Sequence, residues 1–166
     1  MLTSVAHTHL RRAVCAATVS TAACLIIAPA SQATIVPQKS VAGVKLGDSS
    51  MQVQATAGQP ASQEMVHSET TGQVLAYRYP AFTVFFHEDG VISVNVTGRA
   101  QRTSRRVGVG STRAQVLRRV PGAHCTPPGS KYPHCWVGFY RIGRIVTNFV
   151  LRKGRVGEID LSRVMD

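Results

Sequence analysis

Six short stretches of the chain alternate hydrophobic and polar residues, and they fall into two groups of three. Such alternation, rich in Val, Ile, Phe and Tyr, is typical of strands that bury one face. Glu88-Asp89-Gly90 and Arg152-Lys153-Gly154 precede the last stretch of each group and predict hairpin turns. The pattern therefore predicts strands at 73–79, 82–87, 91–97, 135–142, 145–151 and 156–161.

A short helix is predicted ahead of each group of strands. The side chains of Asp48 or Ser49, and later of Ser111 or Thr112, can accept a hydrogen bond from the free N–H groups of a first helical turn. Each helix should bury a stripe of apolar residues four apart, which are Val53 with Ala57 and Val116 with Val120. Both helices should end where glycine and proline follow, at Gly58-Gln59-Pro60 and Pro121-Gly122.

The two groups of strands belong to a longer internal repeat. The segment GDSSMQV at 47–53 returns 63 positions later as GSTRAQV at 110–116, and Tyr77-Arg78 is matched by Tyr140-Arg141. Several such matches in one order are not expected by chance. The sequence therefore predicts a first repeat at 34–98, an Arg-rich linker at 99–106 and a second repeat at 107–166.

The N-terminus has the features of a secretory signal peptide. Arg11 and Arg12 precede a mostly apolar segment, and small residues lie just before Ala33. Cleavage after Ala33 removes residues 1–33, leaves 133 residues and predicts export to the extracellular space or the cell envelope. Two alternatives stay open: Cys24 resembles a lipidation site, and the Arg pair resembles a twin-arginine signal. We expect no membrane span in the mature chain.

Cleavage would leave two cysteines, Cys125 and Cys135, in an oxidising compartment. They flank a Pro-Pro-Gly loop, which predicts a disulfide across a hairpin. His124 and His134 precede the two cysteines and would complete the ligand set of a zinc site. Because adjacent residues on a strand point to opposite faces, the disulfide is favoured, and neither a metal nor a cofactor is expected.

The second copy resembles the second repeat of the secreted β-lactamase inhibitory proteins. The likeness lies in residues 110–117, in Cys125 and Cys135, and in the run Gly138-Phe139-Tyr140-Arg141. The first copy, with Gly47 at its helix start, is similar to the related small outer-membrane lipoprotein A proteins. The resemblance implies an α+β fold of two tandem repeats. Each repeat would pack a short helix-loop-helix on an antiparallel strand meander, and the two sheets would form one concave surface.

The resemblance also implies a place for two contact residues. The Phe and Tyr of the matching run contact the inhibited enzyme, which carries over to Phe139 and Tyr140. The sequence departs from the inhibitor in two respects. Its first repeat lacks cysteines, and no counterpart of a later His and Trp occurs at 145–149.

The sequence carries no catalytic motif that we recognise. A Gly-x-Ser-x-Gly nucleophile elbow does not occur, and Gly108-Val109-Gly110 lacks the third glycine of a dinucleotide fingerprint. Glu158 and Asp160 share one face of a predicted strand, without the facing pair that glycoside hydrolysis needs. The protein is therefore predicted not to be an enzyme, and a small secreted hydrolase is the least favoured alternative.

Charge is distributed unevenly between the predicted repeats. Residues 34–98 include three basic and five acidic residues, whereas 99–166 include 14 basic and three acidic ones. Such a basic half can attract an acidic protein, an anionic envelope polymer or nucleic acid, and it can equally serve only to solvate the surface. Nucleic acid is disfavoured, since an exported protein rarely meets it and few aromatic residues lie near the arginines for stacking.

We therefore expect a secreted, non-enzymatic protein-binding module, inhibitor-like, for an extracellular or envelope protein with an acidic surface. Aromatic anchors and a charged rim would hold this partner. The predicted binding residues are Phe139, Tyr140, Trp136, Arg141, Arg113 and Arg118.

Two further expectations qualify that set. Phe139 and Tyr140 are adjacent on a predicted strand, so only one of them would face the partner. The match of Tyr140 with Tyr77 gives Tyr140 an alternative place in the core of the repeat. The main alternative function is an envelope-associated structural or assembly factor, which a lipid on Cys24 would favour.

Overall fold

The computed structural model describes residues 34–69, 71–88 and 90–165. They all belong to one of the two units into which the chain divides, Ser31–Asp166. The predicted signal peptide, its cleavage site, both arginines of the leader and Cys24 lie outside the described residues.

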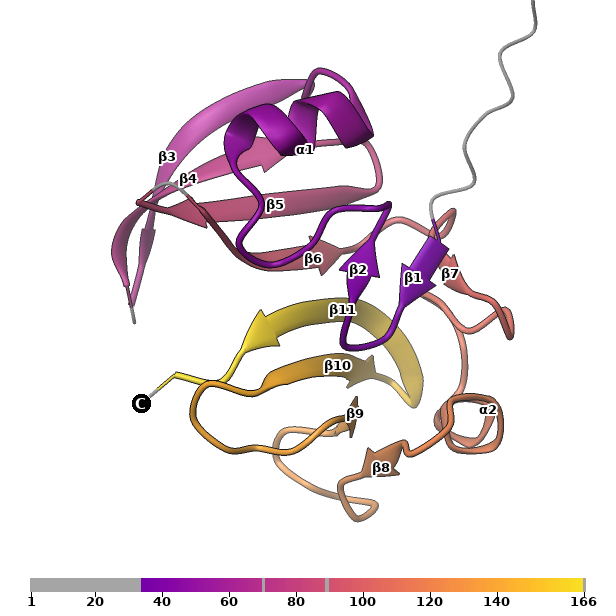
Figure 1. Cartoon of the computed structure of the whole chain (residues 1–166). Helices are drawn as coiled ribbons and strands as arrows, with labels where there is room; N and C mark the ends of the chain where they lie inside the picture. The colour runs from indigo at the N-terminus through magenta and orange to yellow at the C-terminus, as the bar shows by residue number, and fades with distance from the viewer. Residues whose placement is uncertain (1–33, 70, 89, 166) are drawn as a thin grey trace, which may run out of the picture. The chain divides into compact units, whose positions relative to one another are not determined.

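The larger of two sheets has eight strands, all paired antiparallel with their neighbours, in the order β3-β4-β5-β6-β11-β10-β9-β8 (Figure 1). Two meanders therefore meet at the pairing of β6 with β11. The strand bounds are β3 Ser62–Ser68, β4 Gly72–Arg78, β5 Phe82–His87, β6 Gly90–Val96, β8 His124–Cys125, β9 His134–Val137, β10 Ile145–Arg152 and β11 Arg155–Arg163.

The smaller sheet has three short strands in the order β2-β1-β7. Strand β1 (Thr34–Val36) pairs antiparallel with β2 (Ser40–Val41) and parallel with β7 (Arg102–Thr103). The predicted Arg-rich linker at 99–106 therefore contributes a strand to this sheet.

Both predicted helix starts are confirmed. Helix α1 (Ser50–Ala57) begins after Ser49, whose Oγ accepts from the Gln52 N–H at 3.3 Å while the Ser49 N–H donates to Gln52 Oε1 at 2.7 Å. Helix α2 (Arg113–Arg119) has the same reciprocal cap between Thr112 and Gln115. Each cap satisfies N–H groups that the first turn would otherwise leave free.

The predicted α+β fold of helix-loop-helix repeats was wrong. The described chain is mostly β-structure, with two single short helices and one continuous eight-stranded sheet. No second helix follows either one in the described chain. Helix α1 ends at Gly58 (φ 82°), and α2 ends at Val120, whose backbone is extended (φ −105°, ψ 109°). The chain then enters β3 or β8 almost at once.

The predicted strand bounds agree best with the observed ones where one face of the strand is buried. Strand β5 has the predicted bounds, and β4, β6, β10 and β11 differ from them by one or two residues. Strand β3 was not predicted, because it lies at the sheet edge and exposes most of its residues, so it lacks the alternation of a half-buried strand. The short strands β1, β2, β7 and β8 were not predicted either.

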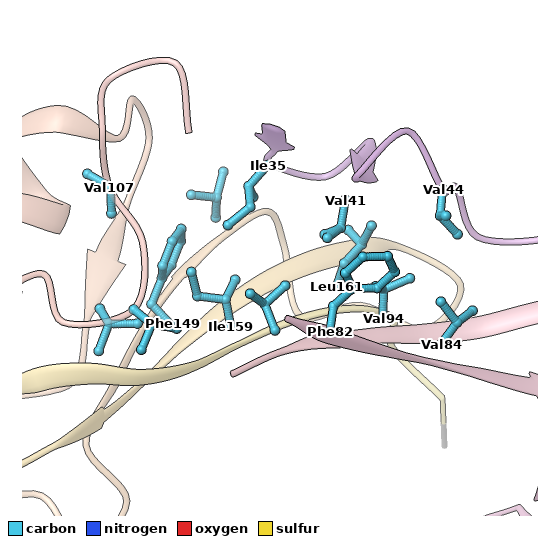
Figure 2. Close-up of a cluster of buried hydrophobic side chains, with 14 of the residues drawn as sticks. Ile35, Val41, Val44, Phe82, Val84, Val94, Val107, Phe149, Ile159 and Leu161 are labelled. Carbon is cyan, nitrogen blue, oxygen red and sulfur yellow. The ribbon is translucent and has the colours of Figure 1, made fainter. Parts of the chain in front are cut away.

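The core lies between the two sheets. In Figure 2, Ile35, Val41 and Val44 point from the β1–β2 region toward the large sheet, where Val94 and Leu161 are labelled. Val94 pairs with Leu161, and Val96 with Ile159, across β6 and β11. All these side chains are almost completely buried, so the small sheet covers the central pairing of the large one.

The predicted disulfide is present. Cys125 on β8 and Cys135 on β9 lie opposite each other in register and are bonded. Within the part of the chain that the structure describes, no three His, Cys, Asp or Glu side chains form a group able to hold a metal ion. No helix among the described residues is long and apolar enough to cross a membrane.

Leu161→Ala should lower the free energy of unfolding by about 2–5 kcal/mol, because it removes buried methyl groups and leaves a cavity at the central pairing. Leu117→Ala is the matched control, since Leu117 on α2 is 42% exposed. It should change stability by about 0.5 kcal/mol or less. Denaturant unfolding followed by circular dichroism measures both. Equal losses for the two variants would contradict this account of the core.

Replacing both bridged cysteines, Cys125→Ala with Cys135→Ala, should cost about 2–5 kcal/mol of stability. The physical reason is the freedom that the unfolded chain regains when a short loop is opened, which the chain-entropy relation puts at about 3 kcal/mol. Unfolding of the unmodified protein with and without a thiol reductant is the parallel measurement. Stability that does not respond to reduction would refute the prediction.

Candidate binding site at the β9–β10 loop

Strand β9 ends at Val137 because of Gly138. Gly138 has φ 107°, and a Cβ there would lie 2.7 Å from the Ile145 carbonyl oxygen and 2.8 Å from Gln38 Nε2. Only glycine fits such a backbone with neighbours so close. The predicted strand at 135–142 is therefore wrong beyond Val137, and residues 138–144 form a loop, which we call the β9–β10 loop.

Backbone hydrogen bonds fix the shape of the β9–β10 loop. The Arg141 N–H donates to the Phe139 carbonyl at 2.8 Å, and the Arg144 N–H donates to the Arg141 carbonyl at 2.9 Å. Two further bonds tie the loop to the chain after β11, from Gly143 to the Val164 carbonyl and from Val164 to the Arg144 carbonyl. The loop is thus closed by two bonds within itself and tied to Val164 at its C-terminal end.

The loop exposes large apolar side chains. Phe139 is 82% exposed, Ile142 65% and Tyr140 53%. Phe139 and Tyr140 line a groove of about 960 Å³, which we call the arginine–aromatic groove. Its lining residues are Gln38, Phe139, Tyr140, Arg141, Gly143, Arg144, Ile145 and Arg163.

The arginine–aromatic groove is positively charged. Arg141, Arg144 and Arg163 line it, and none of its described lining residues is acidic. Arg163 Nη1 donates to the Gly143 carbonyl at 2.7 Å, which holds this guanidinium against the loop. Arg141 and Arg144 are exposed. Exposed cations beside an exposed Phe form a surface that complements an acidic, partly apolar one.

Trp136 supports Tyr140. The centre of its half-buried ring lies 5.7 Å from that of the Tyr140 ring, 5.8 Å from that of His124 and 5.3 Å from that of His134. The Tyr140 hydroxyl donates to Asn148 Oδ1. Burial and the nearby Asp160 raise the pKa of Tyr140, against a smaller opposite effect of Asn148, so the hydroxyl stays protonated at neutral pH. Trp136 thus packs beside Tyr140 and does not itself line the groove.

Tyr140 does not belong to the core. Tyr77, its match in the predicted first repeat, is 5% exposed on β4 and its ring packs on Phe86, whereas Tyr140 lies in a loop and is half-exposed. The alternation expected of Phe139 and Tyr140 also fails, because neither lies on a strand. Both line the same groove.

A second hollow adjoins the groove at Tyr140 and lies on the outer face of the large sheet. The register places Asn95, Asp160, Asn148 and Trp136 in one row across β6, β11, β10 and β9. We call this feature of about 460 Å³ the sheet-face hollow. Its walls include Tyr132, His134 and Tyr140, and its floor includes Asn95, Asn148, Glu158 and Asp160.

The polar groups of the sheet-face hollow bind one another. Asn95 Nδ2 donates to Glu158 Oε1 at 2.7 Å, and Arg152 forms an ion pair with Glu158 at 3.2 Å. The Ser162 hydroxyl donates to Asp160 Oδ2 at 2.6 Å. The expectation that Glu158 and Asp160 share one strand face is confirmed. The hollow could not be predicted from the sequence, because Asn95 joins it only through the pairing of β6 with β11.

The predicted binding residues are only partly brought together. Phe139, Tyr140 and Arg141 line the groove, and Trp136 contacts Tyr140. Arg113 on α2 is half-buried and its Nη2 donates to the Thr126 carbonyl at 3.1 Å, while Arg118 is exposed on the same helix. Neither lines the groove, whose further arginines, Arg144 and Arg163, the sequence analysis missed.

Comparison with known proteins gives distant structural likenesses only. No family model matches the chain, and no curated protein matches it. A DUF4309 family protein (YjgB) from Bacillus subtilis is similar at 14% identity over 70% of this chain and 78% of that one, with a TM-score of 0.40. A cysteine-rich secretory protein (SAV1118) from Staphylococcus aureus is similar at 8% identity over 71% and 44%, with a TM-score of 0.41.

The carboxyl of Asp160 should make stability depend on pH. Burial raises its pKa above the ordinary 3.8, against a partial opposite effect of hydrogen bonds from Ser162 and Asn148. The folded state therefore binds more protons than the unfolded one in the window above pH 3.8, and stability falls as the pH rises through it.

Asp160→Asn removes this titration and keeps the shape of the side chain. We expect the protein with Asp160 to lose stability relative to the Asn variant as the pH rises from about 3 to 7. Urea unfolding of both proteins across that range measures the difference, in which groups common to both cancel. A difference that stays constant, or that changes in the opposite direction, would show that the carboxyl is not held in a desolvated site.

Proposed function

We propose that the protein is a secreted, non-enzymatic binding module that holds an acidic partner protein in the arginine–aromatic groove. One observation carries the proposal: Phe139 is 82% exposed on a hydrogen-bonded loop, in a groove lined by three arginines. An aromatic side chain exposed to this extent on a held loop is unfavourable in water and is available for burial by a partner.

The geometry favours Phe139 as the anchor. Aromatic and Arg side chains near the centre of an interface dominate binding energy, and single truncations there cost about 2 kcal/mol or more. The loop is already fixed by backbone bonds to Val164 and within itself, so little ordering is required on binding. The Tyr140 ring is half-exposed and held by Trp136 and Asn148, which makes it a second, fixed contact.

The arginines select the charge of the partner. Arg141, Arg144 and Arg163 present positive charge at the groove, which attracts carboxylates and speeds encounter with an acidic surface. The adjoining sheet-face hollow contains the carboxyl groups of Glu158 and Asp160. A partner with acidic groups would therefore seat in the groove and not in the hollow.

Export is part of the proposal. Disulfides persist in oxidising compartments, and the Cys125–Cys135 bond agrees with a protein that works outside the cytosol. The N-terminal segment, with Arg11 and Arg12 ahead of an apolar stretch, supports the same proposal.

Phe139→Ala should weaken capture of the partner by about 30-fold, the equivalent of about 2 kcal/mol. Tyr132→Ala is the matched control, because Tyr132 is 72% exposed and lies outside the groove. The measurement is affinity capture of secreted and envelope proteins on the immobilised protein, followed by binding titrations with the captured partner. Equal capture by both variants, or capture of nothing, would overturn the proposed site.

The role of the groove arginines can be tested separately from that of Phe139. Arg141→Gln with Arg144→Gln should slow association and reduce its dependence on salt, because exposed charges are screened over about 10 Å at 0.1 M ionic strength. Arg105→Gln with Arg118→Gln removes the same charge away from the groove. Binding that is insensitive to salt would contradict the role given to the arginines.

The resemblance in sequence names the partner class to test first. Purified β-lactamase would be titrated with the protein and its activity on a chromogenic substrate measured, for the unmodified chain and Phe139→Ala. Inhibition that Phe139→Ala weakens would make a β-lactamase the partner. Inhibition that is equal for both would place its contacts outside the groove.

A further inference from the structure

A second basic surface lies away from the groove and brings five arginines together. It is a hollow of about 490 Å³, and none of its arginines lines the arginine–aromatic groove. We call it the five-arginine pocket. Its arginines are Arg99, Arg102 and Arg106 from the segment around β7, Arg119 from the last turn of α2 and Arg155 from the start of β11.

The fold fixes two of these arginines by backbone carbonyls. Arg102 Nη1 donates to the Arg106 carbonyl at 3.2 Å, and Arg155 Nη1 donates to the Gly110 carbonyl at 3.1 Å. The turn that carries Arg106 is closed by its N–H, which donates to the Thr103 carbonyl at 2.8 Å. Because a guanidinium has five N–H groups, Arg102 and Arg155 keep donors for a ligand.

The positive charge of the five-arginine pocket is not balanced by carboxylates. None of its described lining residues is acidic, and the ion pairs found in the described chain, Arg78–Glu64 and Arg152–Glu158, involve none of the five. Five like charges around one hollow repel one another. A bound anion would relieve that repulsion, so the pocket is built to gain from anion binding.

The donor set indicates phosphate chemistry. The planar guanidinium matches the oxygens of a phosphate group through paired N–H bonds, and Arg is over-represented where phosphate is recognised. One phosphate group carries a charge of about −1.5 to −2 and so balances only about two of the five guanidinium charges. The pocket therefore fits a ligand that presents at least two phosphate groups in succession.

The pocket also indicates what the ligand lacks. Its remaining lining residues are Val109, Gly110, Ser111 and Gln115, and no described lining residue is aromatic. Proteins that bind single-stranded nucleic acid stack bases on aromatic rings beside a basic groove. We propose that the five-arginine pocket binds a chain of linked phosphate groups that carries no bases, independently of the protein partner held at the β9–β10 loop.

Calorimetric titration of the purified protein tests this proposal. The probes are inorganic phosphate, tripolyphosphate, a glycerol-phosphate polymer and a single-stranded oligonucleotide, each at low and moderate salt. Tripolyphosphate or the glycerol-phosphate polymer should bind about tenfold or more tightly than inorganic phosphate, since several guanidinium groups act together. The stronger of the two identifies whether free oligophosphate or a phosphodiester polymer is the better ligand.

Two charge-matched double variants locate the site. Arg106→Gln with Arg119→Gln removes two arginines of the pocket, and Arg105→Gln with Arg118→Gln removes their exposed sequence neighbours, which do not line it. Arg118 and Arg119 both lie in the last turn of α2, so the two variants lose the same helix-dipole interaction. We expect the first variant to weaken tripolyphosphate binding about tenfold or more, and the second about twofold or less.

Three results would overturn the proposal. The first is an equal weakening of tripolyphosphate binding in both double variants, which would show only diffuse attraction by net charge. The second is the absence of tripolyphosphate and polymer binding at low salt. The third is an oligonucleotide that binds as tightly as the glycerol-phosphate polymer and loses affinity in the first variant, which would assign the pocket to nucleic acid.

Discussion

The pairing of β6 with β11 is the interaction on which the rest of the structure depends. It joins two four-stranded meanders into one sheet through the pairs Val94 with Leu161 and Asn95 with Asp160. Side chains alternate along a strand, so the first pair faces the core and the second faces the sheet-face hollow. A slip of one residue would exchange the two faces, which is why core and hollow are fixed by the same register.

The apolar side of this pairing also determines where the groove lies. It is covered by the short strands β1 and β2, and the turn between them carries Gln38. The Gln38 N–H donates to Thr147 Oγ1 at 2.7 Å, and its Nε2 donates to the Ile145 carbonyl at 3.1 Å. This contact lies against Gly138, where β9 ends and the exposed loop with Phe139 begins. The strands that cover the core thus also shape the arginine–aromatic groove.

Local signals predicted the local features. Three features follow from residues close in sequence: the helix caps at Ser49 and Thr112, the bounds of β5 and the Cys125–Cys135 bond. The resemblance to helix-loop-helix repeats misled, because each helix ends after about two turns, α1 at the positive-φ Gly58 and α2 at the extended Val120, and the chain then enters a strand. Phe139, Tyr140 and Arg141 were found as a run, but Arg163 reaches the groove only through bonds between the β9–β10 loop and the chain after β11.

Amide hydrogen exchange in a series of low denaturant concentrations tests the central pairing most directly. If the two meanders form one cooperative unit through β6 and β11, the most protected amides of β4–β6 and of β9–β11 will open with the same free energy and the same denaturant dependence. Two separate opening free energies, one for each meander, would contradict this account.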